Sequence, residues 1–182
     1  MSRFGNLPVQ IPEGVQLDIS NSAVGIKGSR GELSVRIPAS IKVEQVEGNL
    51  IITTKNSNKQ AQADQGTTRS HLVNTVMGVT EGWKKQLEIS GPGYRAEVRD
   101  KDLVVAAGYS HPINFPAPEG ISFSVEKSLI TVEGIDKGVV GQTAAKIKEI
   151  RKPNIYTGSG IKYLGEQIRR KAGKQAAAKG AE

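Results

Sequence analysis

The sequence predicts an α+β protein of two similar, duplicated domains. Each is an antiparallel sheet of two hairpins packed against one helix, and a basic C-terminal tail follows. Three observations predict this fold class. First, Ile11–Gly28 aligns without a gap with Ala117–Gly134, at an offset of 106 residues. Second, four prolines each precede a segment of alternating apolar and polar residues, which is typical of a half-buried β-hairpin. Third, a segment of helical periodicity follows the second hairpin of each half, so the order hairpin, hairpin, helix occurs twice.

Each hairpin of the first half has a counterpart 80 residues later. Pro12 pairs with Pro92, and Pro38 pairs with Pro118, although the alternation slips by one residue inside the first pair. We prefer this offset because it also aligns the helical segments; the offset of 106 joins the first hairpin of one half to the second hairpin of the other. Chance similarity between hairpins with the same turn chemistry is the alternative. The four hairpins are expected at Ile11–Gly28, Ile37–Thr54, Gly91–Gly108 and Ala117–Gly134.

One helix is expected in each half. The first runs from Lys59 to about Val79, and the second runs from its N-cap Asp136 to about Arg151. Their apolar residues recur at helical spacing, at Leu72, Val73, Val76 and Met77 and again at Val140, Ala144 and Ile147. We therefore predict domains at residues 1–82 and 83–152 and a basic tail at residues 153–182. Because the strand and helix patterns end by Lys152, the tail is expected to be dispensable for folding.

The composition excludes several classes of protein. The 182 residues include no cysteine, so the chain has no disulfide, no thiolate metal site and no cysteine nucleophile. No stretch approaches the length of a membrane span, and the N-terminus has no apolar secretory segment. Only Phe4 among the aromatic residues precedes Trp83, so the first domain is expected to have an aliphatic core.

The positive charge is concentrated at the C-terminus. The formal net charge is +7, and residues 151–182 hold eight Lys or Arg against two Glu, which leaves the other 150 residues nearly neutral. A neutral body with a cationic arm favours a polyanionic partner, usually a nucleic acid. A solvated tail without a partner is the alternative, but apolar residues and glycines interleave with the cations between Ile155 and Ile168 and favour docking. The Tyr rings there could stack on bases or pack on the domain, and we favour packing.

The motifs do not support an enzyme. Gly91-Pro92-Gly93 and Ala96 match a loose form of the dinucleotide fingerprint, but alternating strand residues follow where a helix is required, so we predict a turn. The two histidines, His71 and His111, lack the further ligands of a zinc site. We therefore expect no catalytic residue, no cofactor and no metal.

Short motifs that are weak singly resemble, in their order and spacing, bacterial large-subunit ribosomal protein six over essentially the whole chain. They are MSRFGNLPVQIP at the start, GTTRS at 66–70, GVTEGW at 78–83, GYR at 93–95, GYSHP at 108–112, GIDK at 134–137, VGQTAAKI at 140–147 and IRRKAGK at 168–174.

The resemblance implies two α+β domains that arose by duplication and a structural role in the large subunit of the cytoplasmic ribosome. It implies binding of large-subunit ribosomal RNA near the sarcin–ricin loop and the translation-factor site. It also implies contact with neighbouring large-subunit proteins, no membrane and no homo-oligomer. The RNA contacts would lie mainly in the second domain and the tail. Carried over to this sequence, they are His111, Tyr156, Ser159, Lys162, Tyr163, Arg169, Arg170, Lys171 and Lys174.

The chain departs from the family pattern before the final basic run. The family usually has Tyr-Lys-Gly-Lys-Gly, whereas residues 156–160 read Tyr-Thr-Gly-Ser-Gly, so two lysines are missing at Thr157 and Ser159. This predicts a weaker affinity of the isolated protein for RNA. Two rival functions are a tandem-domain adaptor whose basic tail binds an acidic protein surface, and an enzyme with a phosphate-handling site between its domains.

Overall fold

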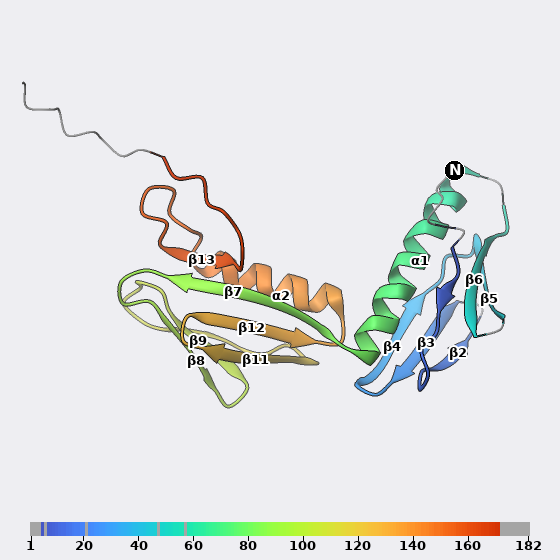
Figure 1. The fold of residues 1–182 in the computed structure, drawn as a ribbon, viewed down its shortest axis with the longest axis horizontal. Coiled ribbons are helices and arrows are strands. Elements are labelled where there is room, and N and C mark those ends of the chain that lie inside the picture. The colour runs from blue at the N-terminus through green and yellow to red at the C-terminus, as the bar shows by residue number, and fades with distance from the viewer. Residues whose placement is uncertain (1–4, 6, 21, 47, 57, 172–182) are drawn as a thin grey trace, which may run out of the picture. The chain divides into compact units, whose positions relative to one another are not determined.

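The computed structural model of the chain describes residues 5, 7–20, 22–46, 48–56 and 58–171 (Figure 1). It divides into two compact units, and each contains antiparallel sheets and helical residues, so the predicted α+β class is confirmed. The first unit comprises Met1–Trp83 and Gly134–Val139, and the second comprises Lys84–Glu133 and Val140–Glu182.

The first unit has two three-stranded sheets and a long helix. The hairpin β2–β3 continues into β4, and the hairpin β5–β6 pairs through β6 with β1. The polar turn and the period-two alternation of each hairpin are local signals, and both expected hairpins form. The elements are β1 (Val9–Gln10), β2 (Gln16–Ile19), β3 (Ala23–Gly28), β4 (Gly31–Arg36), β5 (Ile41–Val46), β6 (Asn49–Thr54) and α1 (Lys59–Thr80).

The core of the first unit is aliphatic, as predicted. Leu72, Val76 and Val79 of α1 are buried against strands of both sheets. Met77 was expected on the same face but is 40% exposed. It follows Val76 directly, and consecutive residues of an α-helix point about 100° apart, so the two side chains leave the helix on different faces. The buried strand residues of this core are Val9, Val24, Ile26, Ile41, Val43, Leu50 and Ile52.

The second unit repeats this plan and adds a strand. The hairpin β8–β9 continues into β10, and the hairpin β11–β12 pairs through β12 with β7, which also pairs with β13. Asp136 caps α2, because its Oδ1 accepts a hydrogen bond of 2.6 Å from the amide of Gly138. The elements are β7 (Trp83–Ser90), β8 (Arg95–Arg99), β9 (Asp102–Ala106), β10 (Ile113–Phe115), β11 (Ile121–Glu126), β12 (Leu129–Gly134), α2 (Lys137–Ile150) and β13 (Gly160–Tyr163).

The two units correspond in chain order. The sheet β2-β3-β4 matches β8-β9-β10, and the order β1-β6-β5 matches β7-β12-β11. This is the correspondence that the offset of 80 residues predicts. The offset of 106 pairs hairpins that take different places in their units.

The tail prediction is wrong in one respect. Residues 160–163, which lie within the predicted tail, form β13 at the edge of the sheet next to β7 (Figure 1). Ile161 is fully buried and lies opposite Ile89. Four residues that begin with a glycine carry too little alternation to predict a strand, and the partner β7 lies about 70 residues earlier in the chain.

Gly134–Val139, which includes the start of α2, belongs to the first unit. The sequence analysis had placed these residues in the second domain, residues 83–152. Ile135 contacts the aliphatic core of the first unit. A Cβ atom on Gly78 of α1 would meet the carbonyl oxygen of Ile135, so glycine permits this close approach of the two backbones.

Candidate nucleic-acid interface

Seven of the nine predicted RNA-binding residues lie in the described C-terminal part of the second unit; His111 and Lys174 do not. We call the loop of residues 153–159, together with residues 168–171, the C-terminal interface. The loop connects α2 to β13, and the later segment follows β13 (Figure 1). The backbone amide of Lys171 donates a hydrogen bond of 3.0 Å to the carbonyl of Ile155 and so ties the two segments together.

Asn154 organises the loop. Its Oδ1 accepts hydrogen bonds from the amides of Tyr156 (2.8 Å) and Thr157 (3.4 Å). Its backbone amide donates to the carbonyl of Ser159 at 2.9 Å, and its carbonyl accepts from the amide of Gly158 at 2.8 Å. Short Asn side chains form such local turns readily. The Tyr156 side chain is 57% exposed, so it does not pack on the unit as the sequence analysis favoured.

Arg170 rests on the loop. Gly158 has a φ of +76°, and a Cβ atom there would lie 2.5 Å from a terminal guanidinium nitrogen of Arg170. Glycine suits this position because the backbone is left-handed, and the absence of a Cβ atom leaves the space that the guanidinium fills. The guanidinium of Arg170 therefore lies against the loop at Gly158.

Three exposed cations form the strip beside the loop. Arg169, Arg170 and Lys171 are all exposed, and no carboxylate among the described residues lies within ion-pairing distance of them. In complexes of proteins with nucleic acids, exposed Arg and Lys side chains commonly bind the phosphate groups. An Arg side chain can bind one phosphate group with two hydrogen bonds. The strip can therefore bind a sugar–phosphate backbone.

Lys162 and Tyr163 are held by contacts within the unit. The Nζ of Lys162 lies 3.0 Å from Oε2 of Glu88, its cross-strand partner on β7. The Tyr163 ring lies 4.7 Å from Nζ of Lys148, and the same Nζ contacts Oε1 of Glu166 at 2.6 Å. The hydrogen bond from Lys148 lowers the pKa of Glu166, and the bond from the Tyr163 amide adds to this effect. Tyr163 thus packs within the unit, as the sequence analysis favoured for the Tyr rings.

The remaining predicted residues are more separate. His111 is exposed in the loop between β9 and β10, and Ser159 is half-buried at the end of the Asn154 loop. Lys174 lies outside the described residues.

A cluster around Arg151, which follows α2 directly, was not predicted from the sequence. The Arg151 Nε donates a hydrogen bond of 3.3 Å to the hydroxyl of Tyr94, and its guanidinium carbon lies 5.2 Å from the ring centroid of Tyr109. Contacts with the two tyrosine hydroxyls raise the pKa of Arg151, the contact with Tyr109 contributing most. The three residues come from distant parts of the chain, and no spacing in the sequence could have joined them. The only signal was that each tyrosine belongs to a turn motif, GPGYR or GYSHP.

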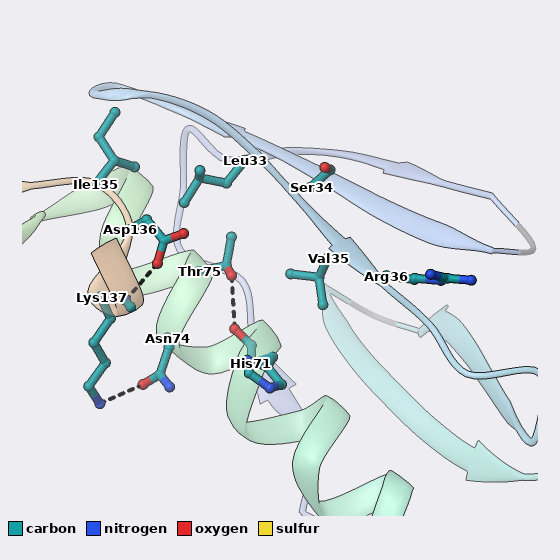
Figure 2. Close-up of a pocket in the computed structure, with 11 residues that line it drawn as sticks. Leu33, Ser34, Val35, Arg36, His71, Asn74, Thr75, Ile135, Asp136 and Lys137 are labelled. Atoms are coloured by element: carbon teal, nitrogen blue, oxygen red, sulfur yellow. Dashed lines mark hydrogen bonds between the residues drawn. The ribbon is translucent and has the colours of Figure 1, made fainter. Parts of the chain in front are cut away.

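A cleft lies within the first unit, apart from the C-terminal interface (Figure 2). It is lined by residues of β4, α1 and the segment that enters α2, and it contains His71. Two of its charged groups have local partners: Lys137 Nζ donates to Asn74 Oδ1 at 3.0 Å and lies 4.3 Å from the ring centroid of Trp83, and Asp136 caps α2. Arg36, which also lines the cleft, is exposed. No group of three or more metal-ligating residues occurs in the part of the chain that the structure describes.

The residues that match the dinucleotide fingerprint do not form a dinucleotide-binding motif. Gly91-Pro92-Gly93 forms a turn, as predicted, and the strand β8 follows it where a phosphate-binding helix would be needed. Across the described residues, no helix is both long enough and apolar enough to cross a membrane.

The family model and the individual relatives that match this chain point to the same protein family. The sequence model of the family described as ribosomal protein L6 matches this chain twice, at residues 11–82 and 90–164, and the second match includes β13. The chain is 47% identical over 175 residues to the large ribosomal subunit protein uL6 of Synechococcus sp. (strain RCC307). It is 46% identical over 175 residues to the protein of the same name from Prochlorococcus marinus (strain MIT 9211). Each alignment covers 96% of this chain and 98% of the relative.

Proposed function

The chain belongs to the ribosomal protein L6 family, and we propose that it binds large-subunit ribosomal RNA through its C-terminal interface. It is a structural protein of the large subunit of the cytoplasmic ribosome and not an enzyme. The contact would lie near the sarcin–ricin loop and the translation-factor site, as the family resemblance implies. Neighbouring large-subunit proteins would be its other partners.

One observation carries the proposal: the guanidinium of Arg170 is seated on Gly158, between two further exposed cations. A surface cation usually loses side-chain freedom when it binds phosphate, and that loss opposes binding. The guanidinium of Arg170 already packs against the loop, and this contact restricts where the side chain can lie before phosphate binds.

The remaining predicted residues would make smaller contributions. Lys162 is paired with Glu88 and would have to exchange a carboxylate for a phosphate. Tyr156 is exposed and could meet a base or a sugar. The residues at the positions of the missing lysines, Thr157 and Ser159, retain hydroxyl groups that can donate hydrogen bonds to phosphate oxygens.

The proposal is tested by charge reversal with a matched control. The variant Arg169→Glu/Arg170→Glu and the control Lys55→Glu/Lys101→Glu change the charge equally, and all four residues are exposed. We expect only the first to weaken binding to large-subunit RNA, with the log–log salt slope reduced by about 0.7 to 0.9 for each phosphate that is no longer neutralised. Equal affinities and slopes for the two variants would overturn the proposal. So would recovery of the protein with an acidic protein and without RNA.

A further inference from the structure

A polar cleft lies in the second unit beside the C-terminal interface. It has a volume of about 580 Å³, within the range of small-molecule sites, and opens between the Gly91–Gly93 turn, the end of α2 and the Asn154 loop. Its lining combines two aromatic rings, a guanidinium and two hydroxyl groups. These belong to Tyr94, Tyr109, Arg151, Thr157 and Ser159.

The aromatic and cationic groups of this cleft are held in fixed positions. Tyr109 donates a hydrogen bond of 2.9 Å from its hydroxyl to the carbonyl of Ile150, while its ring remains 45% exposed. The Arg151 guanidinium lies over that ring and uses Nε to contact Tyr94, which leaves its terminal nitrogens as further donors. The cleft thus presents a ring that the guanidinium covers in part and that is still 45% exposed, next to a charge that is already oriented.

These groups match the parts of one nucleotide. An unstacked base binds to proteins by stacking on an aromatic ring, and its phosphate binds to an Arg or Lys nearby. Arg151 and Lys152 supply cations at the cleft, and the Thr157 and Ser159 hydroxyls can reach base edges or the ribose 2′-hydroxyl. The carboxylate of Glu149 also lines the cleft. It repels a phosphate at its own position and accepts from an amino or imino group of a base, which favours a base rather than a second phosphate there.

We propose that this cleft holds one unpaired, unstacked nucleotide of ribosomal RNA, with its base against Tyr109 and its phosphate at Arg151. The inference rests on the proposed function, because it names the form of RNA that the same face of the protein recognises. Tyr109 and Arg151 are then binding residues, and Tyr94 is a positioning residue that orients the guanidinium.

The experiment compares Tyr109→Leu with Tyr109→Phe in binding to large-subunit RNA across a salt series. Phe keeps the ring and loses the contacts of the hydroxyl with Ile150 and Arg151, while Tyr94 still contacts the guanidinium, so its affinity should fall much less than that of the Leu variant. Leu removes the stacking platform and should weaken binding by about 5- to 150-fold, the effect of losing one stacked base. Because neither change removes a cation that neutralises a phosphate, the salt slope should not change.

A second measurement does not depend on any variant. Ultraviolet crosslinking of purified large subunits, mapped on protein and RNA, should join Tyr109 or Tyr94 to a single unpaired nucleotide. If the unsubstituted protein binds no ribosomal RNA, the proposed function itself fails. If the unsubstituted protein binds RNA and Tyr109→Leu binds equally well, the nucleotide site is wrong while the proposed function stands. The same conclusion follows if Tyr109→Leu loses affinity and its salt slope falls as well. Crosslinks from both tyrosines only to paired nucleotides would also overturn it.

Discussion

Ile161 of β13 lies directly opposite Ile89 of β7, and both side chains are buried in the second unit. The strand that continues toward the basic segment is therefore part of the core. Replacing Ile161 with Ala should lower the free energy of unfolding by about 2 to 5 kcal/mol, because the change leaves a cavity. The control Leu164→Ala removes a side chain that is 54% exposed and should cost no more than about 0.5 kcal/mol. Urea unfolding of both variants makes the comparison, and equal costs would contradict the packing of β13.

Two truncations separate the strand from the arm. A chain ending at residue 171 keeps β13 and should unfold at nearly the same urea concentration as the full protein. A chain ending at residue 152 loses β13 and exposes the buried edge of β7, so its second unit should be destabilised. Circular dichroism and urea unfolding test this, and full stability of the shorter chain would show that β13 adds nothing to the fold.

The contact between Arg170 and Gly158 can be disrupted by a substitution that changes no charge. Gly158 and Gly165 both have positive φ, +76° and +82°, so an added methyl group strains both backbones, by roughly 1–2 kcal/mol. Only at Gly158 does the new Cβ also displace the guanidinium of Arg170; at Gly165 it meets no atom within 4 Å. We expect Gly158→Ala to weaken RNA binding more than Gly165→Ala. Equal affinities in a filter-binding assay would mean that the position of Arg170 does not matter for RNA.

The ion pair of Glu166 with Lys148 should appear in the pH dependence of stability. Folding lowers the pKa of Glu166 from its ordinary value of 4.5, so its contribution is present above that value and is lost as the pH falls through the lower folded pKa. The advantage of the unsubstituted protein over Glu166→Gln should therefore be constant near neutral pH and shrink below about pH 4.5. Thermal unfolding between pH 3 and pH 7 measures it. An advantage that grows as the pH falls would contradict the assignment.

Two glycines of α1 should respond to Ala with opposite signs. Gly66 has no atom within 4 Å of an added Cβ, so Gly66→Ala should stabilise the helix by about 0.5 to 1 kcal/mol. At Gly78 the Cβ would meet the carbonyl oxygen of Ile135, so Gly78→Ala should destabilise the first unit by pushing that segment away. Unfolding free energies of the two variants provide the test, and a stabilising Gly78→Ala would place Ile135 elsewhere.

Independent folding of residues 1–82 stays a prediction, and the structure sharpens it. Such a fragment retains the aliphatic core but lacks Ile135, which packs against that core from beyond the fragment. A fragment of about 80 residues buries a modest core, so we expect cooperative unfolding at a lower urea concentration than in the full chain. Non-cooperative loss of its circular dichroism signal would show that the first unit cannot fold alone.

The sequence by itself determined the hairpins, the two helices, the aliphatic core of the first unit and the order in which the duplicated elements follow one another. These features depend on signals among neighbouring residues: alternation for the strands, helical spacing for α1 and α2, and Asp136 as a cap. It also determined that the positive charge gathers at the C-terminus. Local periodicity and composition are properties of the chain before it folds, so the sequence is sufficient to predict them.

Only the tertiary structure decided which cations the interface can use. It pairs Lys162 with Glu88, seats Arg170 on Gly158 and joins Arg151 to Tyr94 and Tyr109. It also makes a core strand of residues 160–163 and packs Ile135 on the first unit. Each of these pairings joins residues that are well separated in the chain, and most of the partners lie on segments rich in glycine and proline. No repeating pattern encodes such a pairing, because the partners meet only when sheets and helices have packed.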